Sequence, residues 1–132
     1  MSAEKARTAD NANPFEQLVG QGVDEVVFVR DYVQVRFDDY ALLTCVSDPV
    51  VTRDGQSLQF PKAGSRDALC SLIGVDGSEQ EYPRLDTAQF IAGEKIELAF
   101  TTGQVLTVSL VPSHPGWECA HLSVPPGEWW VW

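Results

Sequence analysis

The segment at residues 94–111 constrains the fold of this chain most, because its strand pairing follows from the residue pattern. Apolar and polar side chains alternate on both sides of a central Thr-Thr-Gly, which is the period of strands with one buried face. A two-residue turn would put the two apolar sets on opposite faces. A three-residue loop with glycine in the left-handed conformation instead pairs Leu98 with Leu106. The same register pairs Ile96 with Val108, so the sequence predicts an antiparallel hairpin.

Strand patterns before this hairpin predict a mainly β fold. Residues 23–37 alternate in the same way and reverse near residues 30–32, a register that could bring Glu25 opposite Arg36. A turn at Asp38-Asp39 leads to a third strand at residues 40–46, whose register the pattern does not fix. Further strands are expected at residues 50–52 and 57–60, joined by an Asp-Gly turn, while residues 86–91 fit a short strand or a helical turn.

One convincing helix is expected, at residues 65–72, with Ser65 as its N-cap and Gly74 placed to end it. Its apolar stripe consists of Leu69, Leu72 and Ile73, so it should lie on the sheet. Residues 15–19 could form one helical turn.

The chain has the length of one domain of ordinary size. Residues 1–13 are small and polar, and we expect them to form a disordered leader. Residues 14–132 are expected to form a single β-rich domain. Its predicted architecture is an antiparallel β-sandwich or open barrel of about six to eight strands, with one short helix packed on the sheet.

Charge is the strongest compositional feature, since 19 acidic and 9 basic residues give a net charge of −10. Such a surface repels nucleic acid and anionic membranes and attracts cationic partners, although solubility alone also accounts for it. No apolar run approaches the roughly 20 residues that cross a bilayer, and the N-terminus lacks the apolar core of a signal peptide. Three scattered cysteines agree with the cytoplasmic location that these features predict.

The ending Gly-Glu-Trp-Trp-Val-Trp at residues 127–132 is the most unusual feature. Read as a strand, it places Trp130 and Trp132 on one face and Trp129 on the other. One interpretation is an edge strand over the core, with Trp117 sealing a corner; the other is an exposed tryptophan face ringed by acids, as in an interface hot spot. The candidate partner-binding residues are Trp129, Trp130, Trp132, Asp38, Asp39, Asp76, Glu79, Glu81 and Glu128.

Catalytic and metal sites find little support in the sequence. His114, Cys119 and His121 are zinc-ligand types, but a structural zinc normally needs four ligands, and a turn at Pro-Gly explains this stretch. Cys70 lies away from the helix start that would activate it, so an inert, half-buried thiol is expected. The acidic residues at Asp38-Asp39 and at Asp76, Glu79 and Glu81 lack a positioned catalytic partner. The sequence also has no phosphate-binding glycine loop. We therefore expect no enzyme, no metal and no cofactor.

The order of four segments along the chain is similar in pattern to that of a known group of proteins. These segments are DYVQVRFD at residues 31–38, DPVV at 48–51, RDALCSLIG at 66–74 and the predicted hairpin at 94–111. Together they resemble small uncharacterised bacterial β-rich proteins of the toxin-immunity type. The resemblance covers residues 23–111 and carries no catalytic motif. It implies a shared fold and a non-enzymatic binding role, and it assigns no role to any residue.

The expected function is that of an acidic binding protein, an immunity protein that occludes the active site of a basic toxin domain. A small-ligand-binding β-barrel or weak enzyme is the competing class, for which a deep pocket would be the discriminating feature. A phage-type nucleic-acid mimic that inhibits a defence enzyme is a further alternative. The last alternative is a structural domain that only oligomerises through its tryptophan face. The sequence does not predict the oligomeric state.

Overall fold

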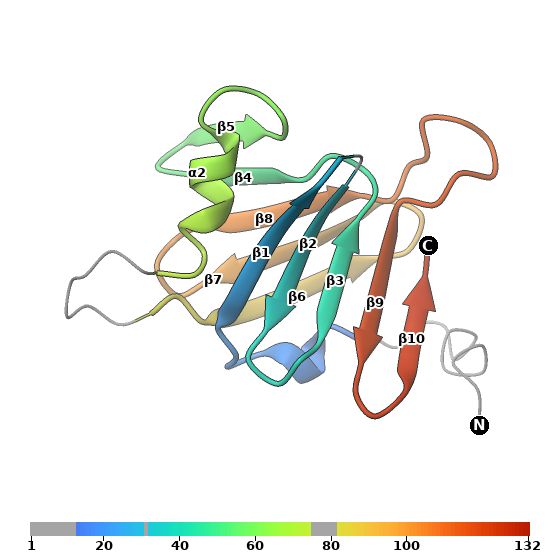
Figure 1. Ribbon diagram of the computed structural model, residues 1–132, viewed down its shortest axis with the longest axis horizontal. Helices are drawn as coiled ribbons and strands as arrows, with labels where there is room; N and C mark the ends of the chain where they lie inside the picture. Colours follow the sequence, from blue (N-terminus) through green and yellow to red (C-terminus); the bar gives the residue numbers. More distant parts are fainter. Residues whose placement is uncertain (1–12, 31, 75–81) are drawn as a thin grey trace.

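The computed structural model describes residues 13–30, 32–74 and 82–132. Within this part of the chain, ten strands form two five-stranded antiparallel sheets with one short helix beside them (Figure 1). The strand order is β1-β2-β3-β9-β10 in the first sheet and β5-β4-β8-β7-β6 in the second. The predicted mainly β class is confirmed, and of the two predicted architectures the structure has the sandwich. The ten strands exceed the expected six to eight.

Each sheet combines strands that are distant in sequence. The first sheet contains β1 (Val23–Val29), β2 (Tyr32–Phe37), β3 (Leu42–Cys45), β9 (Ala120–Val124) and β10 (Glu128–Val131). The second contains β4 (Val50–Arg53), β5 (Gln56–Gln59), β6 (Leu85–Ile91), β7 (Lys95–Phe100) and β8 (Val105–Ser109). A 3-10 turn, η1 (Glu16–Leu18), precedes β1, and helix α2 (Ser65–Cys70) follows β5. Because β9 pairs with β3, the first sheet is complete only when both ends of the described chain come together.

The β7–β8 hairpin has the predicted register. Leu98 lies opposite Leu106, and Ile96 lies opposite Val108. Gly103 has a φ of +97°, the left-handed conformation that the three-residue loop requires and that glycine adopts without steric cost. All four apolar side chains are fully buried between the sheets. Each such burial contributes about 1.5 to 3 kcal/mol, so a change of register would be strongly unfavourable.

Two further hairpins agree with the sequence pattern. Glu25 lies opposite Arg36 in the β1–β2 pair, and the two side chains form an ion pair. The β4–β5 hairpin turns at Asp54 and Gly55, which have φ values of 51° and 78°. Positive φ at both positions defines the type I′ turn that an Asp-Gly pair favours. The ambiguous segment at residues 86–91 is a strand, since it lies in β6.

Helix α2 is two residues shorter than predicted, and its first turn differs from the expectation. Leu69 and Leu72 are buried, as predicted for its apolar stripe. The prediction that Ser65 is the N-cap is wrong, because the cap position belongs to Gly64. Ser65 is the first helical residue, and its buried hydroxyl donates to the carbonyl of Lys62 at 2.6 Å. That hydroxyl therefore stabilises the preceding turn.

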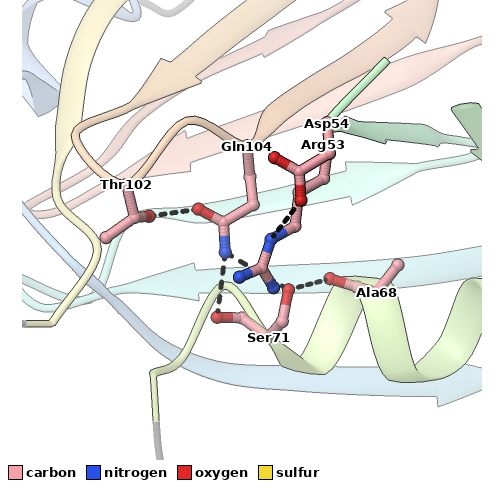
Figure 2. Close-up of polar contacts among 6 residues, drawn as sticks. All are labelled: Arg53, Asp54, Ala68, Ser71, Thr102 and Gln104. Carbon is pink, nitrogen blue, oxygen red and sulfur yellow. Dashed lines mark hydrogen bonds and ion pairs between the residues drawn. The ribbon is translucent and has the colours of Figure 1, made fainter. Parts of the chain in front are cut away.

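A buried glutamine joins the helix end to the second sheet (Figure 2). Gln104 follows the β7–β8 loop and is only 3% exposed. Its Nε2 donates to the hydroxyl of Ser71 at 3.3 Å, and its Oε1 accepts from the hydroxyl of Thr102. Ser71 in turn donates to the carbonyl of Ala68 at 2.6 Å. Because the amide is almost fully buried, these bonds offset its desolvation and fix α2 against the hairpin.

Residues 13–22 cover the outer edge of β6. The predicted helical turn is present as η1, and beyond it the N–H of Gly20 donates to the carbonyl of Leu85 at 2.8 Å. Asn13 Nδ2 donates to the carbonyl of Ala88 at 2.9 Å. An open edge strand invites pairing with another chain, so this segment protects the second sheet on one side.

Candidate partner-binding face

The C-terminal strand β10 divides its tryptophans between two faces, as the strand pattern predicts. Trp130 is 7% exposed and belongs to the core. Trp132 packs against the core, with its ring centroid 5.5 Å from that of Phe15 and 5.2 Å from that of Phe90. Trp129 points the other way and is 48% exposed. Trp130 is thus a core residue, Trp132 is partly buried against the core, and Trp129 is exposed; the role of these three tryptophans in partner binding stays a prediction.

Trp129 lies on the outer face of the first sheet, which we define by two rows of side chains across all five strands. The strand register aligns these residues directly. One row holds Glu25, Arg36, Leu42, Ser123 and Trp129, and the next holds Val27, Gln34, Thr44, His121 and Val131. Apart from the exposed Ser123 and Trp129, these side chains are half-buried, so the face is a continuous surface of moderate polarity.

The outer face of the second sheet differs in composition. Its central row holds Gln59, Val50, Thr107, Glu97 and Gln89. Only one of these five side chains is apolar, against two in each row on the first sheet. The neighbouring row holds the apolar pair Val105 and Ala99, so the clearer difference is Trp129, which among the exposed large hydrophobic residues of the described chain is the one that lies in a strand. Val29 and Tyr32 extend the outer face of the first sheet beyond its second row.

A groove with a volume of about 610 Å³ runs along this outer face beside Trp129. Its floor comes from the neighbouring strands, with Leu42 and Thr44 on β3 and His121 and Ser123 on β9. The Pro-Pro-Gly turn between β9 and β10 closes one end. Among the residues that the structure describes, neither lysine nor arginine lines the groove.

Charges surround the outer face with an excess of acids. The side chain of Arg36 is hydrogen-bonded to Glu25, and this bond, with the attraction between the two charges, raises the pKa of Arg36. This ion pair neutralises the cation on the face. The chain has no lysine or arginine after Lys95, whereas Glu118 and Glu128 border β9 and β10. Glu118 and Glu128 lie at opposite ends of the β9–β10 pair, so the potential along this edge of the first sheet is negative.

The other predicted acidic contacts have different situations. Asp38 is exposed, but its Oδ2 accepts the N–H of Gly22 at 2.9 Å. The N–H of Asp39 donates to Oε1 of Gln21 at 3.1 Å, which leaves the Asp39 carboxylate in solvent. Asp38 therefore ties the β2–β3 loop to the start of β1, and Asp39 remains available to a partner. Asp76, Glu79 and Glu81 lie outside the described residues.

The three side chains considered as zinc ligands have separate surroundings. His114 stacks on Trp117 with ring centroids 4.1 Å apart. His121 Nε2 shares a hydrogen bond of 2.9 Å with Glu118, and Cys119 is buried. Within residues 13–30, 32–74 and 82–132, no group of three or more such side chains is placed to hold a metal ion.

Two expectations about single residues were wrong. Cys70, expected to be half-buried, is exposed, because the core-facing position at the end of α2 belongs to Leu69. Trp117 does not seal a corner of the core: it lies in the loop between β8 and β9 and is 61% exposed. Among the thiols, burial raises the pKa of Cys45 to about 12 and keeps it protonated.

The prediction that the third strand begins at Tyr40 is wrong, because β3 begins at Leu42; Tyr40 lies in the preceding loop, is 68% exposed and has a φ of +70°. It is the third residue of the β2–β3 loop, which closes where the N–H of Phe37 donates to the carbonyl of Ala41 at 2.8 Å. The signal was present in the sequence. Phe-Asp-Asp-Tyr-Ala at residues 37–41 has the spacing of Phe-Thr-Thr-Gly-Gln at residues 100–104, the loop that was predicted correctly.

No helix in the described part of the chain is long and apolar enough to cross a membrane. Comparisons of the chain with protein-family models, with curated proteins and with solved structures find no match. The resemblance to proteins of the toxin-immunity type therefore stays a prediction.

Proposed function

We propose that this protein is a non-enzymatic binding protein that neutralises a cationic protein partner. In the form that we favour, it is a bacterial immunity protein of the cytoplasm, and it covers the active site of a basic toxin domain with the outer face of its first sheet. The observation that carries this proposal is the outer face itself, where the exposed Trp129 and its apolar neighbours lie in a negative field.

The charge distribution supports a cationic partner. A net charge of −10 accelerates encounter with a basic protein and disfavours acidic competitors. The negative edge of the first sheet, along β9 and β10 between Glu118 and Glu128, would guide the partner to the correct side of the molecule. Charges at the rim of an interface act mainly on the rate of association.

The apolar groups of the outer face supply the other requirement, which is a slow rate of dissociation. Hot spots are enriched in tryptophan and tyrosine at the centre of a surface that excludes water. Trp129 beside its groove is such a group, and Leu42 and Val131 provide apolar surface around it. A face of five strands is also rigid, so docking on it requires little ordering.

The test is co-expression with the product of a neighbouring gene that encodes a toxic domain of basic composition. Expressed alone, that domain should arrest growth, and the present protein should restore growth and co-purify with the domain in a stoichiometric complex. Trp129→Ala should weaken this protection, whereas Trp117→Ala should not, since Trp117 is even more accessible but lies outside the outer face.

Purified complex provides the control for mechanism. If the protein blocks the toxin by occlusion, the toxin's activity should fall in proportion to the complex formed, with no turnover of the toxin or of its substrate by this protein. Chemical modification of the toxin, or protection without complex formation, would contradict the proposal and would favour a weak enzyme.

A further inference from the structure

Two loops of this protein have the same hydrogen-bond frame but differ in one critical residue. In the β7–β8 loop, the N–H of Phe100 donates to Gln104 at 2.9 Å, and the N–H of Gly103 donates to Phe100 at 3.0 Å. In the β2–β3 loop, the N–H of Phe37 donates to the carbonyl of Ala41 at 2.8 Å, and Tyr40 donates to Phe37 at 3.0 Å. Each loop places its third residue in the left-handed region.

Tyrosine is an unfavourable residue at this position. A Cβ atom in the left-handed conformation lies too close to the following carbonyl oxygen, and a bulky side chain there is a genuine outlier. Glycine, as in the other loop, has no such conflict. Tyr40 gains little in return, because its ring is mostly exposed and its interaction with Arg36 is electrostatic and lies at a solvent-accessible site. The fold would be more stable with glycine at this position.

The position of Tyr40 suggests why the chain keeps it. The β2–β3 loop lies beside the β9–β10 turn, at the same end of the first sheet (Figure 1). Tyr40 precedes Leu42 by two residues, and Leu42 shares a row with Trp129. The Tyr40 loop thus stands at the same end of the first sheet as Trp129, and the Tyr40 side chain interacts electrostatically with Arg36 of the outer face. Strain without a structural return is typical of residues held for binding.

We propose that Tyr40 is a binding residue of the outer face and that its ring receives an arginine side chain of the cationic partner. The planar guanidinium stacks on aromatic rings and is less strongly hydrated than the ammonium group of lysine. Asp39, the adjacent exposed acid, adds attraction for the same charge. This inference rests on the proposed function, because it names the chemistry that a cationic partner presents to the same face.

The first arm of the test is stability, which needs no partner. Tyr40→Gly should raise the folding equilibrium constant about threefold or more in urea denaturation. Tyr40→Asn should also raise it, since asparagine tolerates the left-handed region without the entropy of glycine. The matched control is Gly103→Tyr, which should lower the constant about tenfold through strain alone, because a Cβ at Gly103 has no heavy atom within 4 Å. A loss of stability in both Tyr40 variants would assign Tyr40 to the fold and overturn the proposal.

The second arm measures binding of a nine-arginine peptide and a nine-lysine peptide by calorimetry at about 0.05 M salt. Tyr40→Gly should weaken binding of the arginine peptide about threefold or more, with a smaller effect on the lysine peptide. Tyr82→Ala is the control, because Tyr82 is similarly exposed outside the outer face. Equal affinity of wild type and Tyr40→Gly would overturn the role of Tyr40 alone. If wild-type protein binds neither peptide, the proposed function fails as well.

Discussion

Phe15 stacks on Trp132, with ring centroids 5.5 Å apart and an interplanar angle of 29°. These residues stand at the two ends of the described chain, and Phe90 of β6 contacts both rings. The cluster joins the end of β10 in the first sheet to the edge strand of the second. The last strand is therefore held by core contacts on one face, and only its other face is accessible to a partner.

This division predicts opposite effects for two adjacent tryptophans. Trp130→Ala should lower the free energy of unfolding by about 3 to 5 kcal/mol, because it leaves a cavity in the core. Trp129→Ala should change it by less than about 1 kcal/mol, since the side chain is half-exposed. Chemical denaturation of both variants measures the difference. Equal losses of stability would contradict the division of β10 into a core face and an outer face.

The packing of helix α2 on the second sheet should depend on the side chain of Gln104. Gln104→Ala removes the amide and leaves Ser71 and Thr102 without their shared partner. The free energy of unfolding should fall by about 1 to 3 kcal/mol. Gln89→Ala, on the exposed side of β6, is the matched control and should stay within about 0.5 kcal/mol. A similar loss in both variants would show that the hydrogen bonds of Figure 2 do not stabilise the fold.

The three thiols should differ in reactivity. Cys70 is exposed, whereas Cys45 and Cys119 are buried. In native protein at neutral pH, a thiol reagent should label one cysteine rapidly and the other two only after unfolding. Cys70→Ser should abolish the rapid phase. Fast labelling of two or three cysteines in the native protein would contradict the burial of the remaining pair.

Stability should fall at alkaline pH through Cys45. Its pKa is raised to about 12 in the folded state, while an unperturbed thiol ionises near pH 8.5. The unfolded chain therefore loses this proton first, so the stabilisation is complete below about pH 8.5 and is lost as pH rises toward 12. Between pH 8.5 and 10, wild type should lose about 1.5 kcal/mol more than Cys45→Val, as measured by urea denaturation. An equal loss in both proteins would show that Cys45 is not the titrating group.

The sequence predicted the parts of the fold in which the loop length and the alternation of apolar and polar side chains allow only one strand register. For Leu98 and Leu106, only the three-residue loop gives a register in which both side chains are buried. The third strand was harder, because recognising its loop requires accepting Tyr40 at a position that normally calls for glycine. The cap of α2 was missed because the two neighbours Gly64 and Ser65 are both acceptable caps, and only the surrounding turn decides between them.

The candidate site was less predictable, because it depends on which side of a strand meets the core. Parity separates Trp129 from Trp130 but does not say which of them is exposed. That distinction follows from tertiary packing, in which Trp132, next to β10, contacts Phe15 and Phe90, two residues remote in sequence. The face of a sheet that binds a partner is a tertiary property, so single-residue patterns leave it open.

The most direct test of a charged, aromatic docking face is the kinetics of complex formation with the cationic toxin domain at two salt concentrations. Raising salt from about 0.05 to 0.5 M shortens the Debye length from about 14 to 4 Å, and association should slow at least about tenfold. Trp129→Ala should leave association nearly unchanged and should accelerate dissociation by a factor equivalent to about 2 kcal/mol or more. An association rate independent of salt, together with normal dissociation of Trp129→Ala, would contradict the account and would place the binding surface elsewhere.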